Sequence, residues 1–216
     1  MRLVTDRQPP NKQQLRTERS TNALLEAAMD LIVEGGFDAL TFAAIGEMAG
    51  YSRGLVTARF GNKEGLMDAL IDRIVTSWSH KNVLPRTKSR PGLDGLLILI
   101  DAIRVQAAED PRGLRVLYSL MFEATADEAL RLRFAKFHEV MRSDVARLVR
   151  TGQRDGSIRP GLDPDLEGAL LVSGLRGIGY QWLLDLRGFD PVPQLQYLHD
   201  TIRDRLATDG AVPNRN

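Results

Sequence analysis

Polar side chains that could read a DNA duplex gather between residues 41 and 63. Val56 and Phe60 form the apolar stripe of a short predicted helix, and Arg53, Thr57 and Arg59 lie off that stripe. A helix that enters the major groove must expose donors and small groups on the face opposite its core. An arginine can bond both O6 and N7 of guanine, which is worth roughly 1–3 kcal/mol of discrimination. We therefore expect Arg53 and Arg59 to be the base readers, with solvated arginines as the alternative.

Further residues around this helix are suited to hold phosphates. Thr41, Ser52 and Lys63 stand at predicted helix starts, where free N–H groups and the helix dipole attract anions. Gly54 removes a side chain where the backbone would approach the DNA, and Arg16 and Arg19 could follow a groove or the phosphates. The expected DNA-binding set is Arg19, Thr41, Ser52, Arg53, Gly54, Leu55, Thr57, Arg59 and Lys63.

The elements that would position these residues are short helices with strong stop signals. An apolar stripe that includes Leu24 and Ile32 ends at Gly35-Gly36, and a second short helix ends at Gly50. Ser52 caps the third helix at once, and Lys63 begins a longer one that runs to about residue 82. Two short helices across a three-residue turn are a helix-turn-helix.

This stretch resembles the N-terminal domain of TetR-family transcription regulators. The resemblance spans about 50 residues at the usual spacing and rests on these positions: Leu24-Leu25-Glu26-Ala27-Ala28, Gly36-Phe37, Thr41, Ile45, Ala49-Gly50, Ser52-Arg53-Gly54, Phe60 and Lys63-Glu64-Gly65-Leu66. The chain departs from the family at Gly46, Tyr51, Thr57 and Arg59, which puts the habitual DNA contacts at the last two in doubt. Gly46, in place of the common alanine, should weaken its helix by up to about 1 kcal/mol.

The rest of the chain predicts a second helical domain. We expect a flexible basic arm over residues 1–15 (or a mere solubilising tail), a DNA-binding domain over 16–62, a connecting helix over 63–82, an effector-binding and dimerisation domain over 83–210, and a disordered tail over 211–216. A linker is expected from Pro85 to Pro91, followed by helices at about 92–109, 111–125, 127–152, 163–187 and 191–207. The predicted fold class is all-α.

Aromatic and methionine side chains in the second domain predict an adaptable ligand pocket, although such stripes are also common in plain cores. The family resemblance favours the pocket, because the C-terminal domain of these regulators usually binds an effector. The candidate effector-binding residues are Trp78, Arg104, Tyr118, Met121, Phe122, Phe134, Phe137, His138 and Met141.

Small residues within the predicted helix over 163–187 indicate close approach of another helix. In the resembled family, the last two long helices of each subunit pair in a four-helix bundle, which predicts a homodimer here. The candidate interface residues are Leu170, Ser173, Gly174, Gly177, Tyr180, Gln181, Leu198 and Ile202. Local flexibility or packing within one subunit is the alternative.

Composition excludes several other classes of site. The chain has no cysteine and three scattered histidines, which leaves little for a metal site or a cofactor. Its longest apolar run is far below the roughly 20 residues of a membrane span, so we expect a cytoplasmic protein. A net charge of +1 argues against a non-specific nucleic-acid binder, and the adjacent pair His138 and Glu139 is a weak basis for an all-helical enzyme.

The sequence therefore favours a dimeric transcription regulator that reads a near-palindromic operator in double-stranded DNA. It would be a repressor that a small-molecule effector with an apolar part releases from its operator. We expect no catalytic residues in it. The effector, the operator and the target genes are not readable from the residues.

Overall fold

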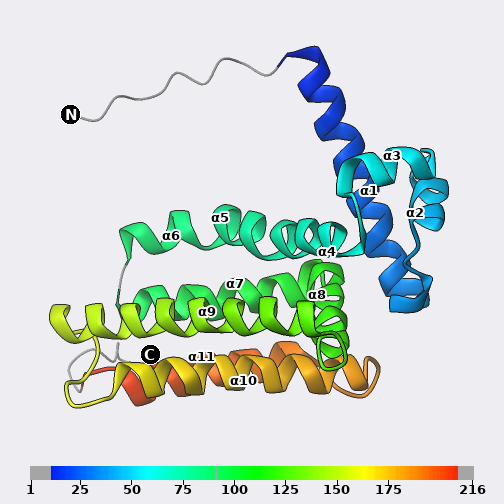
Figure 1. The fold of residues 1–216 in the computed structure, drawn as a ribbon. Helices are drawn as coiled ribbons and strands as arrows, with labels where there is room; N and C mark the ends of the chain where they lie inside the picture. The colour runs from blue at the N-terminus through cyan, green and yellow to red at the C-terminus, as the bar shows by residue number, and fades with distance from the viewer. Residues whose placement is uncertain (1–10, 91, 209–216) are drawn as a thin grey trace. The chain divides into compact units, whose positions relative to one another are not determined.

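The computed structural model describes residues 11–90 and 92–208, and their regular structure is helical (Figure 1). Among these residues the β-structure amounts to an isolated bridge between Ile158 and Ala207. The chain divides into two compact units, one ending at Leu70 and the other beginning at Ile71. The all-α prediction is confirmed, while the predicted arm residues 1–10 and the tail 211–216 lie outside the described residues.

The first unit is a small helical domain around a helix-turn-helix. It contains α1 (Lys12–Gly35), a short 3-10 turn η1 (Phe37–Ala39), α2 (Phe42–Ala49), α3 (Arg53–Phe60) and most of α4 (Lys63–Ile71). The Thr41 and Ser52 hydroxyls cap α2 and α3 by accepting from the backbone N–H groups of Ala44 and Leu55 at 3.1 and 3.2 Å. The core is built from Leu24, Ala28, Ile45, Val56, Leu66 and Leu70.

Helix α1 begins earlier than the sequence analysis predicted. Asn11 and Gln14 form a reciprocal capping box, in which each side chain accepts a hydrogen bond from the other residue's backbone N–H. Residues 12–15, assigned to a flexible arm, are therefore helical, and Arg16 and Arg19 lie on the helix instead of before it.

Gly46 has a role that its helix propensity does not predict. A Cβ at this position would lie 2.7 Å from the carbonyl oxygen of Tyr51, and the Tyr51 N–H donates to the Gly46 carbonyl at 2.7 Å. The turn between α2 and α3 thus folds back onto the backbone of α2. The glycine costs helix propensity, but it provides the space that this close approach requires.

The segment after α4 is more helical and less regular than expected. A π-helical segment, η2 (Asp72–Ser77), and α5 (Trp78–Asn82) occupy the predicted connecting helix. The predicted linker instead contains α6 (Leu84–Ser89), because Pro85 stands in the first turn, where a proline fits a helix; Pro91 lies outside the described residues.

The second unit contains five long helices close to those predicted: α7 (Leu93–Glu109), α8 (Arg112–Glu123), α9 (Glu128–Asp155), α10 (Pro164–Leu184) and α11 (Pro191–Leu206). Asp127, Asp163 and Asp190 cap α9, α10 and α11. Helix α10 packs chiefly on α9, and α11 packs on α7.

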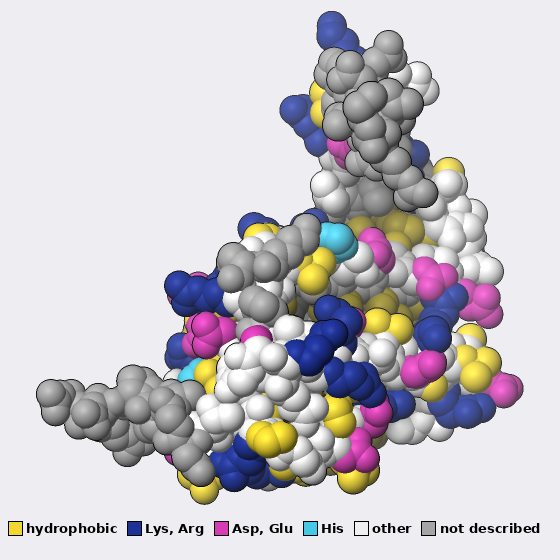
Figure 2. Space-filling model, turned by 90° about the vertical axis from the view of Figure 1, so that its left-hand side faces the viewer, with side chains coloured by type: hydrophobic (Ala, Val, Ile, Leu, Met, Phe, Trp, Pro, Cys, Tyr) yellow, Lys and Arg dark blue, Asp and Glu magenta, His cyan; other side chains and the backbone are white. Residues whose placement is uncertain are grey.

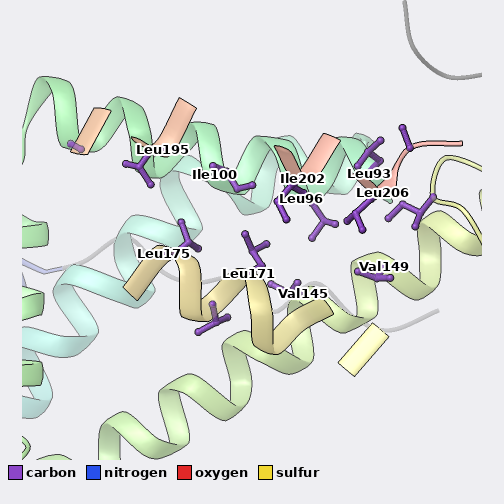
Figure 3. Close-up of a cluster of buried hydrophobic side chains, with 14 residues drawn as sticks. Leu93, Leu96, Ile100, Val145, Val149, Leu171, Leu175, Leu195, Ile202 and Leu206 are labelled. Atoms are coloured by element: carbon purple, nitrogen blue, oxygen red, sulfur yellow. The ribbon is translucent and has the colours of Figure 1, made fainter. Parts of the chain in front are cut away.

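Figure 3 shows the core of the second unit, where leucine, isoleucine and valine side chains from four helices point toward one another. Leu96 and Ile100 come from α7, Val145 and Val149 from α9, Leu171 and Leu175 from α10, and Leu195, Ile202 and Leu206 from α11. Charges stay outside this core. On the face drawn in Figure 2, basic and acidic side chains are interspersed, as expected for a nearly neutral chain.

Candidate nucleic-acid interface and ligand site

Helix α3 exposes the face that the sequence analysis predicted for base contacts. Arg53, Gly54 and Thr57 are exposed, and Leu55 is half-buried. The Thr57 hydroxyl donates to the Arg53 carbonyl at 3.2 Å, while the Arg53 guanidinium pairs with no acidic group among the described residues. Val56 and Phe60 are buried on the other side of the helix. This arrangement leaves Arg53 free to contact a ligand outside the domain.

Arg59 is oriented differently, contrary to its expected role as a base reader. Its Nη2 donates to the Thr17 and Ser20 hydroxyls of α1, at 3.4 and 3.2 Å, and the side chain is half-buried. The buried Ser20 side chain gains a charged donor through this contact. The geometry therefore assigns Arg59 to holding α3 against α1.

The other predicted phosphate contacts lie at helix starts and on α1. The Lys63 ammonium lies 4.0 Å from the centre of the Phe37 ring, a cation–π contact, although Lys63 remains exposed. Thr41 and Ser52 are exposed caps, and Arg16 and Arg19 are exposed on α1. These groups add exposed positive charge and helix-start N–H donors to the unit that contains α3.

Tyr51, which was not among the predicted DNA contacts, stands in the turn immediately before the cap of α3. Its side chain is 39% exposed, and the nearby Met48 on α2 is also exposed. A phenolic hydroxyl here could donate to a phosphate. The sequence signal for Tyr51 was an aromatic residue placed in a turn, between Gly50 and the helix cap Ser52.

In the second unit, four predicted effector residues gather around Arg176 of α10. Its Nε donates to Nε2 of His138 at 3.0 Å, its Nη1 donates to the Tyr118 hydroxyl at 3.3 Å, and its Nη2 lies 2.9 Å from the Met141 sulfur. The guanidinium carbon lies 5.2 Å from the centre of the Phe137 ring. We call these five residues the Arg176 cluster; its members come from α8, α9 and α10.

His138 is neutral at physiological pH within this cluster. Burial and the neighbouring charge of Arg176 lower its pKa from the usual 6.5 to about 4, and Arg142 adds to the shift. The neutral ring can therefore accept the Arg176 hydrogen bond. Tyr118 is buried, and its hydroxyl donates to the Leu175 carbonyl at 2.9 Å.

Arg176 itself was not predicted as a site residue. It is the one charged residue between Glu167 and Asp185, in an otherwise uncharged stretch that contains several glycines. A guanidinium in the middle of such a helix must either pair locally or serve a ligand, and this signal was available in the sequence.

The remaining predicted effector residues do not all join the cluster. Phe134 is buried against Phe137, with ring centres 6.3 Å apart, whereas Phe122 is 52% exposed. Met121 is half-buried, and Arg104 is ion-paired with Asp101 at 2.6 Å. The side chain of Trp78 lies outside the described structure.

A cavity of about 230 Å³ lies elsewhere in this unit, between α5, α6 and α7. Polar and charged side chains line it together with two apolar ones: Lys81, Asn82, Arg86, Ala102, Val105, Gln106, Glu109 and Asp110. None of the predicted effector residues whose side chains the structure describes is among them.

The described residues contain no group of three or more histidine, cysteine or acidic side chains that could hold a metal ion. Over the same ranges, no helix has the length and apolar character needed to cross a bilayer.

Comparison with known proteins identifies the family. Residues 24–70 match the family described as bacterial regulatory proteins of the tetR family, and residues 94–207, more than half of the chain, match the C-terminal domain of BetI-type transcriptional repressors. The chain belongs to the TetR family. It is accordingly a helix-turn-helix transcription regulator, from a family of ligand-responsive repressors. The general function predicted from the sequence is confirmed.

Individual relatives are distant but cover most of this TetR-family chain. It is 26% identical over 195 residues to the transcriptional regulator BetI of Burkholderia lata, with 86% of this chain and 93% of that protein covered. A regulator from Saccharomonospora viridis in complex with choline matches with a TM-score of 0.74 at 21% identity, over 88% of this chain and 99% of that one. The SmeT–triclosan complex matches with a TM-score of 0.76 at 22% identity, over 91% of this chain and 96% of that one. SmeT is the repressor of the multidrug efflux pump SmeDEF of Stenotrophomonas maltophilia.

The regulator's predicted dimer residues lie partly on an exposed surface and partly in its own core. Leu170, Ser173, Gly177, Tyr180 and Gln181 are exposed on α10. Ile202 is instead buried in the core of its own chain (Figure 3), which corrects its assignment to an interface. Gly174 approaches Leu198 of α11, because a Cβ there would lie 3.4 Å from the leucine side chain.

Proposed function

We propose that this TetR-family regulator acts as a homodimer that binds an inverted repeat through two copies of α3. The exposed face of α3 is the observation that carries the proposal, because Arg53, Gly54 and Thr57 present a free guanidinium beside small groups at a capped helix start. The expected contacts also include Leu55, Thr41, Ser52, Lys63 and Arg19, with Arg59 as a positioning residue.

The dimer would form through α10. Large apolar side chains are exposed along this helix, with Leu166, Leu170, Tyr180 and Leu184 between 48% and 67% accessible in the single chain. A monomer rarely exposes so many along one helix without a partner. To fit an inverted repeat, the two recognition helices of such a dimer must lie about 34–36 Å apart, which is the spacing of successive major grooves.

In this proposal residues 16–62 bind DNA, and residues 83–210 bind an effector and dimerise. Residues 63–82 connect these two parts of the chain. The effector would bind one conformation of the second unit better than the other. The operator would bind the regulator better when that unit is in the other conformation. Two structural relatives are in complexes with choline and with triclosan, which supports a small molecule as the effector.

The test is selection of bound sequences from a random DNA pool at physiological salt, with the wild type, Arg53→Ala and Arg147→Ala. Arg147 is an exposed arginine of α9 that pairs with Asp144, so its variant controls for the loss of one surface charge. We expect an enriched inverted repeat for the wild type and the control, and relaxed guanine positions for Arg53→Ala. Enrichment of no sequence, or of a single half-site, would contradict the proposal.

A further inference from the structure

Arg176 differs in its partners from four arginines of the second unit that pair with carboxylates. Arg104, Arg147, Arg150 and Arg205 all form ion pairs with acidic side chains of neighbouring turns or helices. No described carboxylate pairs with Arg176, which is half-buried; its three hydrogen bonds go to an imidazole, a phenol and a thioether. A charge removed from water without an opposite charge is costly, so this arrangement calls for an anion.

The groups that face Arg176 do not neutralise it. His138 is neutral, the Tyr118 hydroxyl donates to the Leu175 carbonyl, and Arg142, one turn beyond His138 on α9, adds a second positive charge. Glu139 is the nearest acid along α9, but its side chain is exposed and accepts a hydrogen bond from Lys136 at 2.9 Å. The Arg176 cluster is therefore positive overall.

The guanidinium has bonding capacity left. An arginine has five N–H donors, and the three contacts of Arg176 leave one hydrogen free on each of its two terminal nitrogens. These two N–H groups can donate to the oxygens of a carboxylate. Phe137 and Met141 add apolar and polarisable surface beside this charge.

The backbone is shaped to bring Tyr118 to this place. A Cβ at position 179 would lie 1.8 Å from Cζ of Tyr118, so only glycine lets the tyrosine ring cross α10 and reach both Arg176 and the Leu175 carbonyl. The Arg176 cluster thus depends on the glycine at position 179 of α10.

We propose that Arg176 binds the carboxylate of an amphiphilic organic acid, whose apolar part lies against Phe137 and Met141. The inference rests on the proposed function, because this acid would be the effector that releases the operator. It narrows the effector to an anionic class and gives the charge-binding role to a single residue.

Calorimetric titration with matched compounds tests the inference. The probes are linear carboxylates of 4 to 12 carbons and aryl carboxylates, each compared with the amide and the amine of the same skeleton. The proteins are the wild type, Arg176→Gln, Arg176→Lys and the control Arg147→Gln. We expect at least one acid to bind the wild type and the control about tenfold or more tighter than its amide. Arg176→Gln should lose this preference, and Arg176→Lys should keep only part of it.

A second readout separates binding at the cluster from a general loss of structure. A carboxylate beside Arg176 offsets the positive charge near His138, so the acid should raise the His138 pKa, followed by NMR, in the wild type. An acid preference that survives in Arg176→Gln, or no acid preference in the folded wild type, overturns the inference.

Operator binding without any acid keeps the two proposals distinguishable. Wild type that binds an inverted repeat but prefers no acid leaves the proposed function intact and removes the anionic effector. Wild type that prefers an acid but selects no DNA sequence removes the proposed function and leaves an anion-binding domain.

Discussion

Two arginines of α3 illustrate how placement separates roles at the scale of single residues. Arg59 donates to two hydroxyls of α1, whereas Arg53 is exposed and unpaired among the described residues. Arg59→Ala should lower the free energy of unfolding by about 1–2 kcal/mol, because it removes a charged donor from the buried Ser20. Arg53→Ala should stay within about 0.5 kcal/mol of the wild type and lower operator affinity instead. Urea unfolding and DNA titration of both variants measure this contrast, and equal stabilities would contradict it.

His138 makes the stability of the second unit sensitive to acid. Its folded pKa of about 4 lies below the usual 6.5, so between these pH values the unfolded chain binds a proton that the folded chain does not. Stability should therefore be unaffected by His138 above pH 6.5 and fall as the pH drops toward 4. The variant His138→Gln, which can still accept from Arg176, should lose less stability than the wild type between pH 7 and pH 5.

Urea unfolding of both proteins at the two pH values is the measurement. Glu139 and Asp200, whose carboxyl pKa values are lowered by hydrogen bonds from Lys136 and His199, add acid sensitivity to both proteins. The loss of unfolding free energy between pH 7 and pH 5 is compared in the two proteins, and this comparison cancels the contribution of the two carboxyl groups. Equal losses would show that His138 titrates normally.

Gly179 should be intolerant of any side chain. Gly179→Ala would drive a methyl group into the Tyr118 ring and should lower the free energy of unfolding by about 2 kcal/mol, typical of overpacking. Gly113→Ala is the matched control, because the nearest atom to its Cβ would be Ile74 Cγ2 at 3.9 Å. The control should be neutral or stabilising by up to about 1 kcal/mol through helix propensity. Thermal unfolding of both variants measures the difference.

At the scale of elements, the run from α4 through the π-helical η2 to α5 joins the two units of the chain. One glycine inserted between Ile71 and Asp72 would rotate all later helical positions by about 100° relative to α4. We expect the variant to bind operator and effector separately but to lose most of the coupling between them.

Linkage makes this coupling measurable, since it equals the ratio of effector affinities with and without operator. A glycine inserted after Gly161, in the exposed loop between α9 and α10, serves as the control and should leave the ratio unchanged. An intact ratio in the first variant would show that the connecting run does not transmit the effector signal.

At the scale of the whole molecule, the apolar face of α10 should decide the oligomeric state. Leu170→Glu places a charge on the proposed interface and should convert the dimer to a monomer with strongly reduced operator affinity. Leu132→Glu is a matched control on α9, because Leu132 is 58% exposed and Leu170 is 53% exposed. Sedimentation equilibrium of both variants tests the prediction. If the Leu170→Glu variant remains dimeric, the dimer interface does not include this face of α10.

The sequence was most informative where the determining interactions are local. Helices α7 to α11 follow the predicted ranges closely, because apolar periodicity and the aspartate caps act within a few residues. The same reasoning found the helix-turn-helix and the outward face of Arg53. It missed the Asn11 capping box and α6, although both carried local signals in Asn11-x-x-Gln14 and in a proline of the first helical turn.

The sequence by itself determined the all-helical fold, the helix-turn-helix and the family, since these follow from periodicity, caps and a long motif. Only the tertiary structure decided which candidates meet. It turned Arg59 toward α1, buried Ile202 in its own core, and brought Tyr118, His138 and Met141 from two helices around Arg176 of a third. The physical reason is that a helix periodicity specifies which face of each helix is buried, but not which residues of another helix that face will contact.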